Sequence, residues 1–425
     1  MSRAKRKQAE RKLKPAKKSA APVTLQLGIF LIAFLIVFSR RPDAVLNAQF
    51  WAEDGKLWYS QAYQSGLHSF LIPDEGYLQT LSRSIALLSL LFPFSVAPLV
   101  MNLCASVVQI LPVNVFLSSR FSHIPLVPRL VGCVLYLAIP NSSEVHANVT
   151  SIQWHLALLA CLVLLAPSER SRGWLIFDAV GLVLISFSSP MGIVLLGVAA
   201  ALWLKRRNRA SLVSLGLLVP GAIVESLVTL LSHSREVAQN GATVARFITI
   251  LGGQVFFMAV LGKATAVGFT RHEFFLCAVV AAAVGVAVLL YALRYAPFEL
   301  KVFIAFSFAV FGLGLARPVA GAGEVQWERL CLPGACERYW FFPMLAFLAC
   351  LVWMAWRQSS PLIVRCLGAL LLLSALIGIH QDWTYRPFVD FQFQQYAAAF
   401  EQAPKGAKST IPLNPRGWFM VLTKQ

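Results

Sequence analysis

Two adjacent carboxylic acids stand among aromatic residues near the start of the chain. Glu53 and Asp54 lie in the run FWAEDGKLWYSQAYQSGL, residues 50–67, with aromatic side chains on both sides. A carboxylate beside aromatic rings suits general-base chemistry on a sugar hydroxyl, because the rings can pack against the sugar. A structural explanation is also open. Asp54 would cap a helix beginning at Gly55, and the aromatic residues would form a belt at a membrane surface.

A second polar group follows in VHANVTSIQWHLAL, residues 145–158. Amide, imidazole and indole groups gather there, and a sugar site uses such groups for hydrogen bonds and ring packing. We expect sugar or acceptor contacts from this group and from the tyrosine that follows a second acidic pair in the first loop: Asn148, Gln153, Trp154, His155 and Tyr77. The alternative is that Trp154 belongs to the membrane belt and that His155 is a helix-end histidine with satisfied hydrogen bonds.

Three arginines are candidates for binding a phosphate. Arg329 and Arg338 lie in EVQWERLCLPGACERYWFFP, and Arg338 stands at the start of an apolar run. Arg83 lies in the apolar stretch 78–92, which is closed by a proline. A guanidinium group binds two phosphate oxygens at once, so Arg338 is the first choice and Arg83 the second. Each arginine could instead reach out to ordinary lipid phosphate.

The rest of the chain has the composition of a membrane protein. Of 425 residues, 58% are hydrophobic and only 13% are charged, with a mean hydropathy of +0.67. A soluble chain carries about 25% charged residues. The composition therefore excludes a water-soluble enzyme, a disordered protein and a nucleic-acid module. The net charge of +18 includes a dense basic block between Arg3 and Lys18, which reads as an anchor at anionic lipid rather than a nucleic-acid surface.

Apolar runs of bilayer length predict an all-α polytopic membrane protein with about eleven transmembrane helices. The expected spans are 25–38, 97–118, 127–140, 153–166, 174–187, 190–204, 211–232, 273–293, 300–316, 339–356 and 362–380. Lysine and arginine are more frequent in the segments that this layout places inside, so the N-terminus is expected to be cytoplasmic and the C-terminus outward. Residues 246–270 are treated as an outward-side or re-entrant segment, because a span there would invert every later loop.

The layout divides the chain into three parts. Residues 1–23 are expected to form a basic, disordered cytoplasmic arm, and residues 24–380 the transmembrane domain. Its first outward loop, 40–96, is expected to contain interfacial helices, with one at 78–92. Residues 381–425 are expected to form a short outward segment that folds back on the outer loops.

One outward loop also carries two cysteines, Cys331 and Cys336, in CLPGAC. In an oxidising compartment they could form a disulfide around the Pro-Gly turn, and two free thiols are the alternative. A zinc site is not expected, because no matching His/Cys pair lies nearby. We expect no cofactor, although a divalent metal stays open.

An acidic pair in the first outward loop, a short interfacial helix with an arginine, and then a second span resemble the GT-C superfamily. These polytopic glycosyltransferases use polyprenyl-phosphate sugars as donors. The resemblance implies that an acid of that loop is the general base, here Asp54 with Glu53 as the substitute, in an inverting transfer to a cell-envelope glycan, lipid or protein. Arg338, with Arg83, would stabilise the departing phosphate. The resemblance also implies the inner (plasma) membrane, with the site on the periplasmic or extracytoplasmic face.

Two other functions stay open. A lipid-linked glycan ligase, polymerase or carrier would share the arginine-rich outward face but need no carboxylate, so Arg338 or His155 would be essential and Asp54 would not. A non-catalytic assembly factor is the third. Ionisable residues are scarce within the expected spans, which disfavours a proton-coupled carrier.

Overall fold

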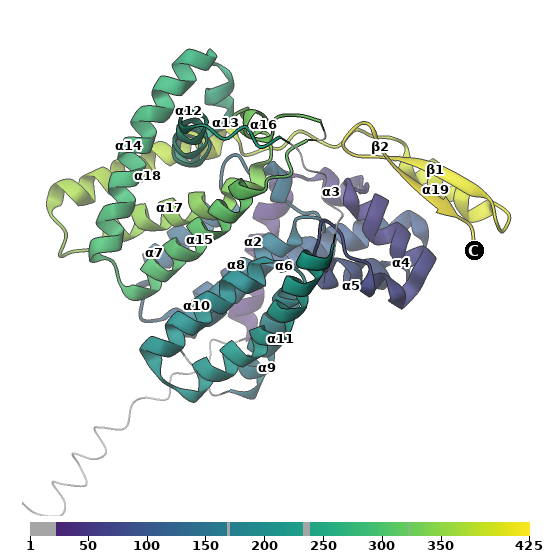
Figure 1. Cartoon of the computed structure of the whole chain (residues 1–425), viewed down its shortest axis with the longest axis horizontal. Coiled ribbons are helices and arrows are strands. Elements are labelled where there is room, and N and C mark those ends of the chain that lie inside the picture. The colour runs from purple at the N-terminus through teal and green to yellow at the C-terminus, as the bar shows by residue number, and fades with distance from the viewer. Residues whose placement is uncertain (1–22, 168–170, 233–238, 322) are drawn as a thin grey trace, which may run out of the picture.

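The computed structural model describes residues 23–167, 171–232, 239–321 and 323–425, and this part of the chain is almost entirely helical (Figure 1). One two-stranded sheet lies at the C-terminal end of the described residues. The predicted basic arm lies outside the described residues except for Val23, so its disorder stays a prediction.

Among the described residues, eight helical segments are long and apolar enough to cross a membrane. They are α2 (Val23–Arg40), η3–α6 (Phe94–Val96, Ala97–Leu117), α11 (Arg209–Leu231), α12–η6–α13 (Val244–Ile248, Thr249–Phe257, Met258–Val267), α14 (Arg271–Tyr295), α15 (Phe298–Ala316), η7–α17 (Glu337–Trp340, Phe341–Trp356) and α18 (Leu362–Gln381). Four shorter helices complete the bundle: α7 (Leu126–Leu137), α8 (Ile152–Leu165), α9 (Arg172–Ser186) and α10 (Met191–Arg206). Each of the eleven expected spans thus coincides with a helix. The chain is a multi-helix membrane protein, and its number of crossings stays a prediction.

The α12–η6–α13 segment runs beside the connection between α15 and α17. Arg246 near its start pairs with Glu328 at 3.1 Å, and Lys263 near its end pairs with Glu337 at 2.9 Å. Between them, the Gln254 amide donates to the carbonyl oxygen of Leu330 at the end of α16 (Gln326–Leu330), at 3.1 Å, and to that of Leu332, at 2.9 Å. One connection therefore follows the segment over most of its length. The length and composition of the segment fit a membrane crossing, so its expected place on the outward side stays a prediction.

Several connections meet at one end of the bundle, which we call the site end: residues 41–93, 138–151, 317–336 and 382–425. The Arg40 guanidinium at the end of α2 is buried there. It donates to the carbonyl oxygens of Leu137, Ile139, Asp382 and Trp383 over 2.8–3.2 Å. These hydrogen bonds join the ends of α2, α7 and α18. The segments expected on the outward side therefore share one end of the molecule.

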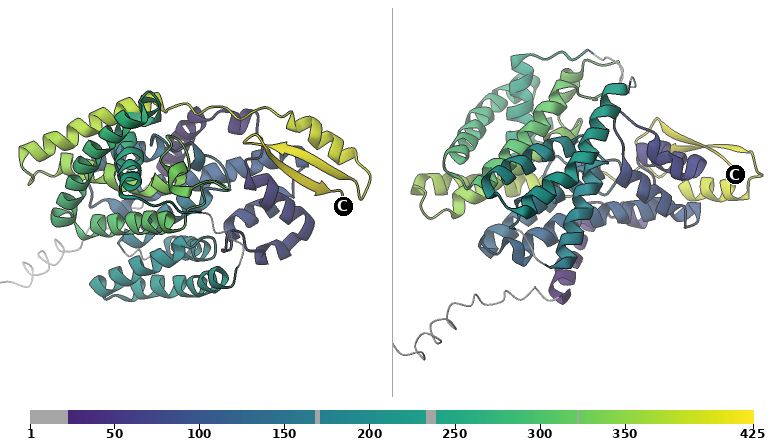
Figure 2. Two further views of the ribbon diagram at one scale, coloured as in Figure 1. Left: turned by 45° about the horizontal axis from the view of Figure 1, so that its top comes forward. Right: turned by 60° about the horizontal axis from the view of Figure 1, so that its bottom comes forward.

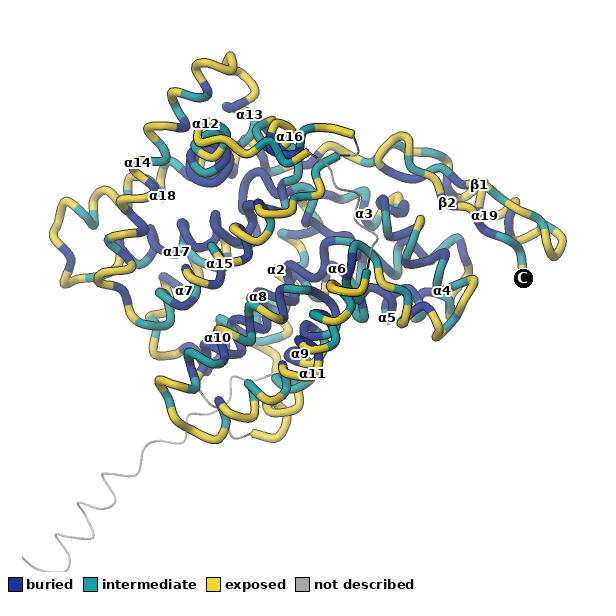
Figure 3. Tube along the Cα trace, viewed as in Figure 1, coloured by how far each residue is buried: buried dark blue, intermediate teal, exposed yellow. Residues whose placement is uncertain are grey.

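Two helices form the centre of the bundle. α8 and α17 are buried along most of their length, whereas α2, α11 and α18 expose many apolar side chains on the outside (Figure 3). Large exposed leucine, isoleucine and valine side chains on the outer helices suit contact with lipid rather than water. The bundle therefore surrounds a protein-packed centre with an apolar exterior.

The first loop contains short helical pieces: α3 (Asp43–Leu46), η1 (Asp54–Tyr59), α4 (Ser60–Ser65), η2 (Gly66–Leu71) and α5 (Thr80–Ser89). The C-terminal segment packs onto them through α19 (Phe393–Gln402), β1 (Lys408–Leu413) and β2 (Trp418–Thr423) (Figures 1 and 2). Their shared aromatic core includes Phe50, Tyr59, Phe94, Phe393 and Phe400. This second core fixes the loop that carries Glu53 and Asp54.

Close packing of η6 against α14 depends on glycine. A Cβ at Gly252 would overlap the carbonyl oxygen of Ala278, whereas a Cβ at Gly312 in α15 would meet open space. We expect Gly252→Ala to lower the melting temperature of the purified protein, because overpacking costs about 1–3 kcal/mol. Gly312→Ala should leave the melting temperature unchanged or raise it, since alanine has a higher helix propensity than glycine. A thermal melt in detergent measures both, and equal effects of the two variants would contradict the packing.

Candidate functional site

Asp54 is fully buried at the start of η1 and holds the connection 138–151 in place. Its Oδ1 accepts from the Thr150 backbone N–H at 2.6 Å and from the Thr150 hydroxyl at 2.7 Å. Its Oδ2 accepts from the Val149 N–H at 3.1 Å. Burial outweighs these hydrogen bonds and raises the pKa of Asp54 to about 7. A fully buried carboxylate with three donors positions a loop, and it offers no exposed oxygen to an acceptor.

Glu53 is the more accessible acid of the pair. Its side chain is partly exposed, and the Thr150 hydroxyl lies within hydrogen-bonding reach of it. Burial raises the pKa of Glu53, while the nearby Arg338 guanidinium lowers it and the Glu144 carboxylate raises it. A partly accessible carboxylate with a raised pKa has the properties of a general base.

Arg338 lies next to this acid, at the start of η7–α17. Its Nη1 donates to Glu144 Oε1, and its backbone N–H donates to Glu144 Oε2 at 3.1 Å. Nη2 donates to the Val319 carbonyl. The side chain of Arg338 is 28% exposed, so it is reachable from outside. An incoming phosphate would compete with Glu144 for this guanidinium.

Tyr77 and Gln153 complete the group. The Gln153 Nε2 donates to the Tyr77 hydroxyl at 3.2 Å, and the charges of Asp74 and Arg338 both act on Tyr77. Burial raises the pKa of Tyr77 to about 12, so its hydroxyl stays protonated at neutral pH. The structure therefore brings five of the expected residues together from the first loop, α8 and the start of η7–α17: Glu53, Asp54, Tyr77, Gln153 and Arg338.

Arg83 and Arg329 do not join this group. The Arg83 guanidinium is fully buried, stacks on Trp58 at 5.1 Å, donates to Gln61 at 2.6 Å and also donates to a backbone carbonyl of the first loop. Burial lowers the pKa of Arg83 to about 10. Arg329 is exposed and lies 3.7 Å from Glu324. Arg83 therefore holds the first loop together, and Arg329 lies on the outer surface.

His155 and Trp154 fit the structural alternative. The two ring nitrogens of His155 bond to the Tyr136 hydroxyl at 2.8 Å and to the Val145 carbonyl at 2.6 Å. Trp154 packs on Phe342 with ring centres 5.7 Å apart. Both side chains are buried in the bundle, so neither presents a group to a sugar in this structure.

Asn148 also acts within its own connection. Its amide donates to the carbonyls of Glu144 and His146, and its Oδ1 accepts from the Ser151 N–H at 2.8 Å. These bonds shape the turn that delivers the N–H groups of residues 149 and 150 to Asp54. Asn148 is therefore placed to support the site rather than to contact a substrate.

In the structure Cys331 and Cys336 are both free thiols, which is the second of the two alternatives that the sequence left open. The sulfur of Cys331 lies against the Arg246 carbonyl, and that of Cys336 lies against the Ala320 carbonyl. The two side chains face different neighbours on either side of the turn, which keeps them apart. In the part of the chain that the structure describes, no group of three or more His, Cys, Asp or Glu side chains fits a metal ion.

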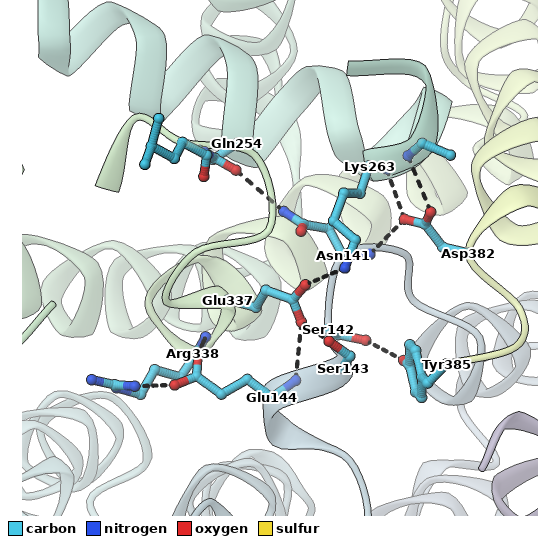
Figure 4. Close-up of polar contacts among 12 residues, drawn as sticks. Asn141, Ser142, Ser143, Glu144, Gln254, Lys263, Glu337, Arg338, Asp382 and Tyr385 are labelled. Atoms are coloured by element: carbon cyan, nitrogen blue, oxygen red, sulfur yellow. Dashed lines mark hydrogen bonds and ion pairs between the residues drawn. The ribbon is translucent and has the colours of Figure 1, made fainter. Parts of the chain in front are cut away.

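A network that sequence reasoning missed surrounds the connection 138–151. We call it the polar hub, and Figure 4 labels its members: Asn141, Ser142, Ser143, Glu144, Gln254, Lys263, Glu337, Arg338, Asp382 and Tyr385. The buried Glu337 carboxylate accepts from the Ser143 hydroxyl at 2.7 Å, the Glu144 N–H at 3.0 Å and the Lys263 ammonium at 2.9 Å. These partners come from two segments distant in sequence from Glu337, the connection 138–151 and α13.

Asp382 closes the other side of the polar hub. Its Oδ2 accepts from the backbone N–H groups of Asn141 at 3.0 Å and Lys263 at 2.7 Å. Nearby, the Ser142 hydroxyl bonds to the Tyr385 hydroxyl at 2.9 Å. The run of polar residues at 141–144 could have indicated such a network, but the sequence does not show which residues they contact.

The raised pKa of Asp54 makes stability depend on pH. Because about 7 exceeds the ordinary 3.8, the folded chain binds this proton more tightly than the unfolded chain. Protonated Asp54 therefore stabilises the folded state. This stabilisation is full below the unfolded-state pKa of 3.8 and is lost as the pH rises through the folded-state pKa of about 7. We expect the melting temperature to fall between about pH 5 and pH 8, and to fall less in Asp54→Asn. Asp390→Asn, a control in the C-terminal segment, should keep the full decrease. An unchanged decrease in Asp54→Asn would refute the assignment.

Comparison with known proteins assigns no family to this arrangement. No known protein family matches the sequence, and no curated protein is similar enough to count as a relative.

Proposed function

We propose that the protein is a membrane glycosyltransferase that moves a sugar from a polyprenyl-phosphate donor to a cell-envelope acceptor. The observation that carries the proposal is the meeting of the partly exposed Glu53 carboxylate and the Arg338 guanidinium at one end of an apolar helical bundle. Sugar transfer from a phosphate needs a base for the acceptor and a cation for the leaving group. A donor with a hydrocarbon chain needs that pair next to lipid.

The proposed reaction is a single inverting displacement. Glu53 takes the proton from the acceptor hydroxyl as the acceptor oxygen bonds to the anomeric carbon. The bond from that carbon to the phosphate oxygen breaks, and polyprenyl phosphate leaves with the electron pair. Arg338 stabilises the charge that grows on the leaving phosphate. Glu53 replaces Asp54 as the preferred base because its carboxylate is the accessible one.

Asp54 then has a positioning role. Its hydrogen bonds fix Val149 and Thr150, and the Thr150 hydroxyl lies between the two acids. Tyr77 and Gln153 supply neutral donors that suit sugar hydroxyls. The outward orientation of this site and its place in the inner (plasma) membrane remain parts of the proposal, supported by the charge distribution along the sequence.

Binding of the donor requires an exchange of partners at Arg338. In the structure, Glu144 accepts two hydrogen bonds from Arg338, one from the guanidinium and one from the backbone N–H. A donor phosphate would take the place of one of them, since both groups are anions that bind the same guanidinium fork. Glu144 would stay anchored through its backbone N–H, which donates to Glu337.

A turnover assay tests the proposed roles of Glu53 as general base and Arg338 as phosphate-binding cation. The purified protein in lipid nanodiscs is mixed with polyprenyl-phosphate hexose or pentose as donor and an envelope extract as acceptor. The assay measures the release of polyprenyl phosphate. We expect Glu53→Gln to lower the rate by about 10²–10⁴, the usual contribution of a general base. Arg338→Gln should cause a loss of about 10²–10³, as for other preorganised donors to a developing charge. Glu328→Gln and Arg246→Gln alter another acid–arginine pair at the site end and should keep wild-type rates.

The other outcomes separate the alternatives. Full activity of Glu53→Gln with loss in Arg338→Gln would contradict the general base and favour a ligase, polymerase or carrier. Wild-type protein that turns over none of these donors would contradict the enzyme and favour an assembly factor.

A further inference from the structure

A cavity of about 460 Å³ lies within the bundle, away from the site end. Side chains of α6, α7, α8, α15 and α17 line it, and Figure 1 shows α7, α15 and α17 side by side. The lining is almost entirely hydrocarbon, with Phe116, Leu135, Leu162, Phe303 and Leu348 among its members. An apolar cavity does not hold water well, and a void of this size is strongly unfavourable if it stays empty.

The cavity is long and lies along α17. Its lining on that helix runs from Leu345 to Trp356, which the helical rise converts to about 16 Å. Half of the hydrocarbon core of a bilayer is about 15 Å thick. A cavity of this length therefore matches one lipid chain in one leaflet.

The end of the cavity toward the candidate site is closed. Tyr136 bounds it there, and its ring packs against His155 and Phe341 with centres 5.9 and 6.2 Å away. All three side chains are buried. A donor bound near Glu53 therefore has no open path into the cavity in this structure.

The opposite end is open. The lining residues His123, Pro125, Pro297 and Trp356 are exposed there. Arg357 also lines this mouth, where it stacks on Trp353 at 5.0 Å and donates to the Tyr295 carbonyl and the Ser359 hydroxyl. A lipid chain can thus enter the cavity from the bilayer at this end.

The mouth carries more positive than negative charge. Arg294, Lys301 and Arg357 lie around it, and Glu299 is the acid among its lining residues. Cations at headgroup depth attract anionic lipid, and a guanidinium binds the phosphate oxygens.

We propose that this cavity binds one acyl chain of an anionic phospholipid from the leaflet at this end, with the lipid phosphate at Arg357. The site goes beyond the proposed sugar transfer and does not depend on it. The lipid would fill the space between α7, α15 and α17 and so stabilise the half of the bundle that carries Arg338. The layout from the sequence predicts that this leaflet is the cytoplasmic one.

Lipid retention by the delipidated full-length protein tests the site. Phosphatidylglycerol, phosphatidylcholine with the same chains, and polyprenyl phosphate are each added in detergent, and native mass spectrometry counts the bound molecules. Gly132 lines the cavity, and a Cβ there meets only Phe116 at an ordinary contact distance. Gly132→Leu should fill the cavity and lower phosphatidylglycerol retention about tenfold, equivalent to 1.4 kcal/mol. Gly312→Leu, on the outer surface of α15, should retain the lipid like wild type.

A second cavity-filling variant, Ala349→Leu, covers the case in which Gly132→Leu fails to fold. Arg357→Gln should remove the preference for phosphatidylglycerol over phosphatidylcholine while a chain still binds. Equal retention by wild type and a folded filling variant would overturn the proposal. So would displacement of phosphatidylglycerol from wild type by polyprenyl phosphate, because the occupant would then be the donor chain.

Discussion

Burial of charged groups at the site end is the constraint on which the rest of the structure depends. A buried carboxylate or guanidinium is costly unless hydrogen bonds and opposite charges compensate for the lost water. Glu337, Asp382 and Arg40 are each buried with three or four hydrogen bonds. Their partners lie in segments that are far apart along the chain. These hydrogen bonds can therefore form only when the ends of α2, α7 and α18 and the start of η7–α17 arrive together.

This constraint also positions the candidate site. The connection 138–151 is held by the polar hub on one side and by Asp54 on the other. The same connection supplies Glu144 to Arg338 and Thr150 to the acidic pair. The C-terminal strands pack on η1 from outside and fix the loop that carries Glu53. The site thus combines rigid surroundings with two groups, Glu53 and Arg338, that keep some exposure.

Sequence periodicity and composition were enough to locate the helices and the gathering of the long connections. The apolar runs coincide with helices because a bilayer requires about 20 apolar residues per span. The residue types around Glu53, Asp54 and Arg338 were enough to predict these three as candidate site residues. Pairing across the fold was not predictable. Arg83 appears in sequence as an interfacial cation, yet Trp58 and Gln61 enclose it. His155 resembles a site histidine, yet Tyr136 satisfies it, and Asp54 rather than Glu53 took the buried position. Each of these outcomes depends on a long-range partner that one sequence does not identify.

The central claim is that Arg338 binds the donor phosphate while Glu53, beside the sugar, takes the proton from the acceptor hydroxyl. The most direct measurement is a cryo-electron microscopy structure of the full-length protein in nanodiscs with a polyprenyl-phosphate sugar. We expect donor phosphate oxygens at about 3 Å from the Arg338 guanidinium, in place of Glu144, with the sugar beside Glu53 and the polyprenyl chain in the bilayer. A donor bound elsewhere while Arg338 stays paired with Glu144 would contradict it.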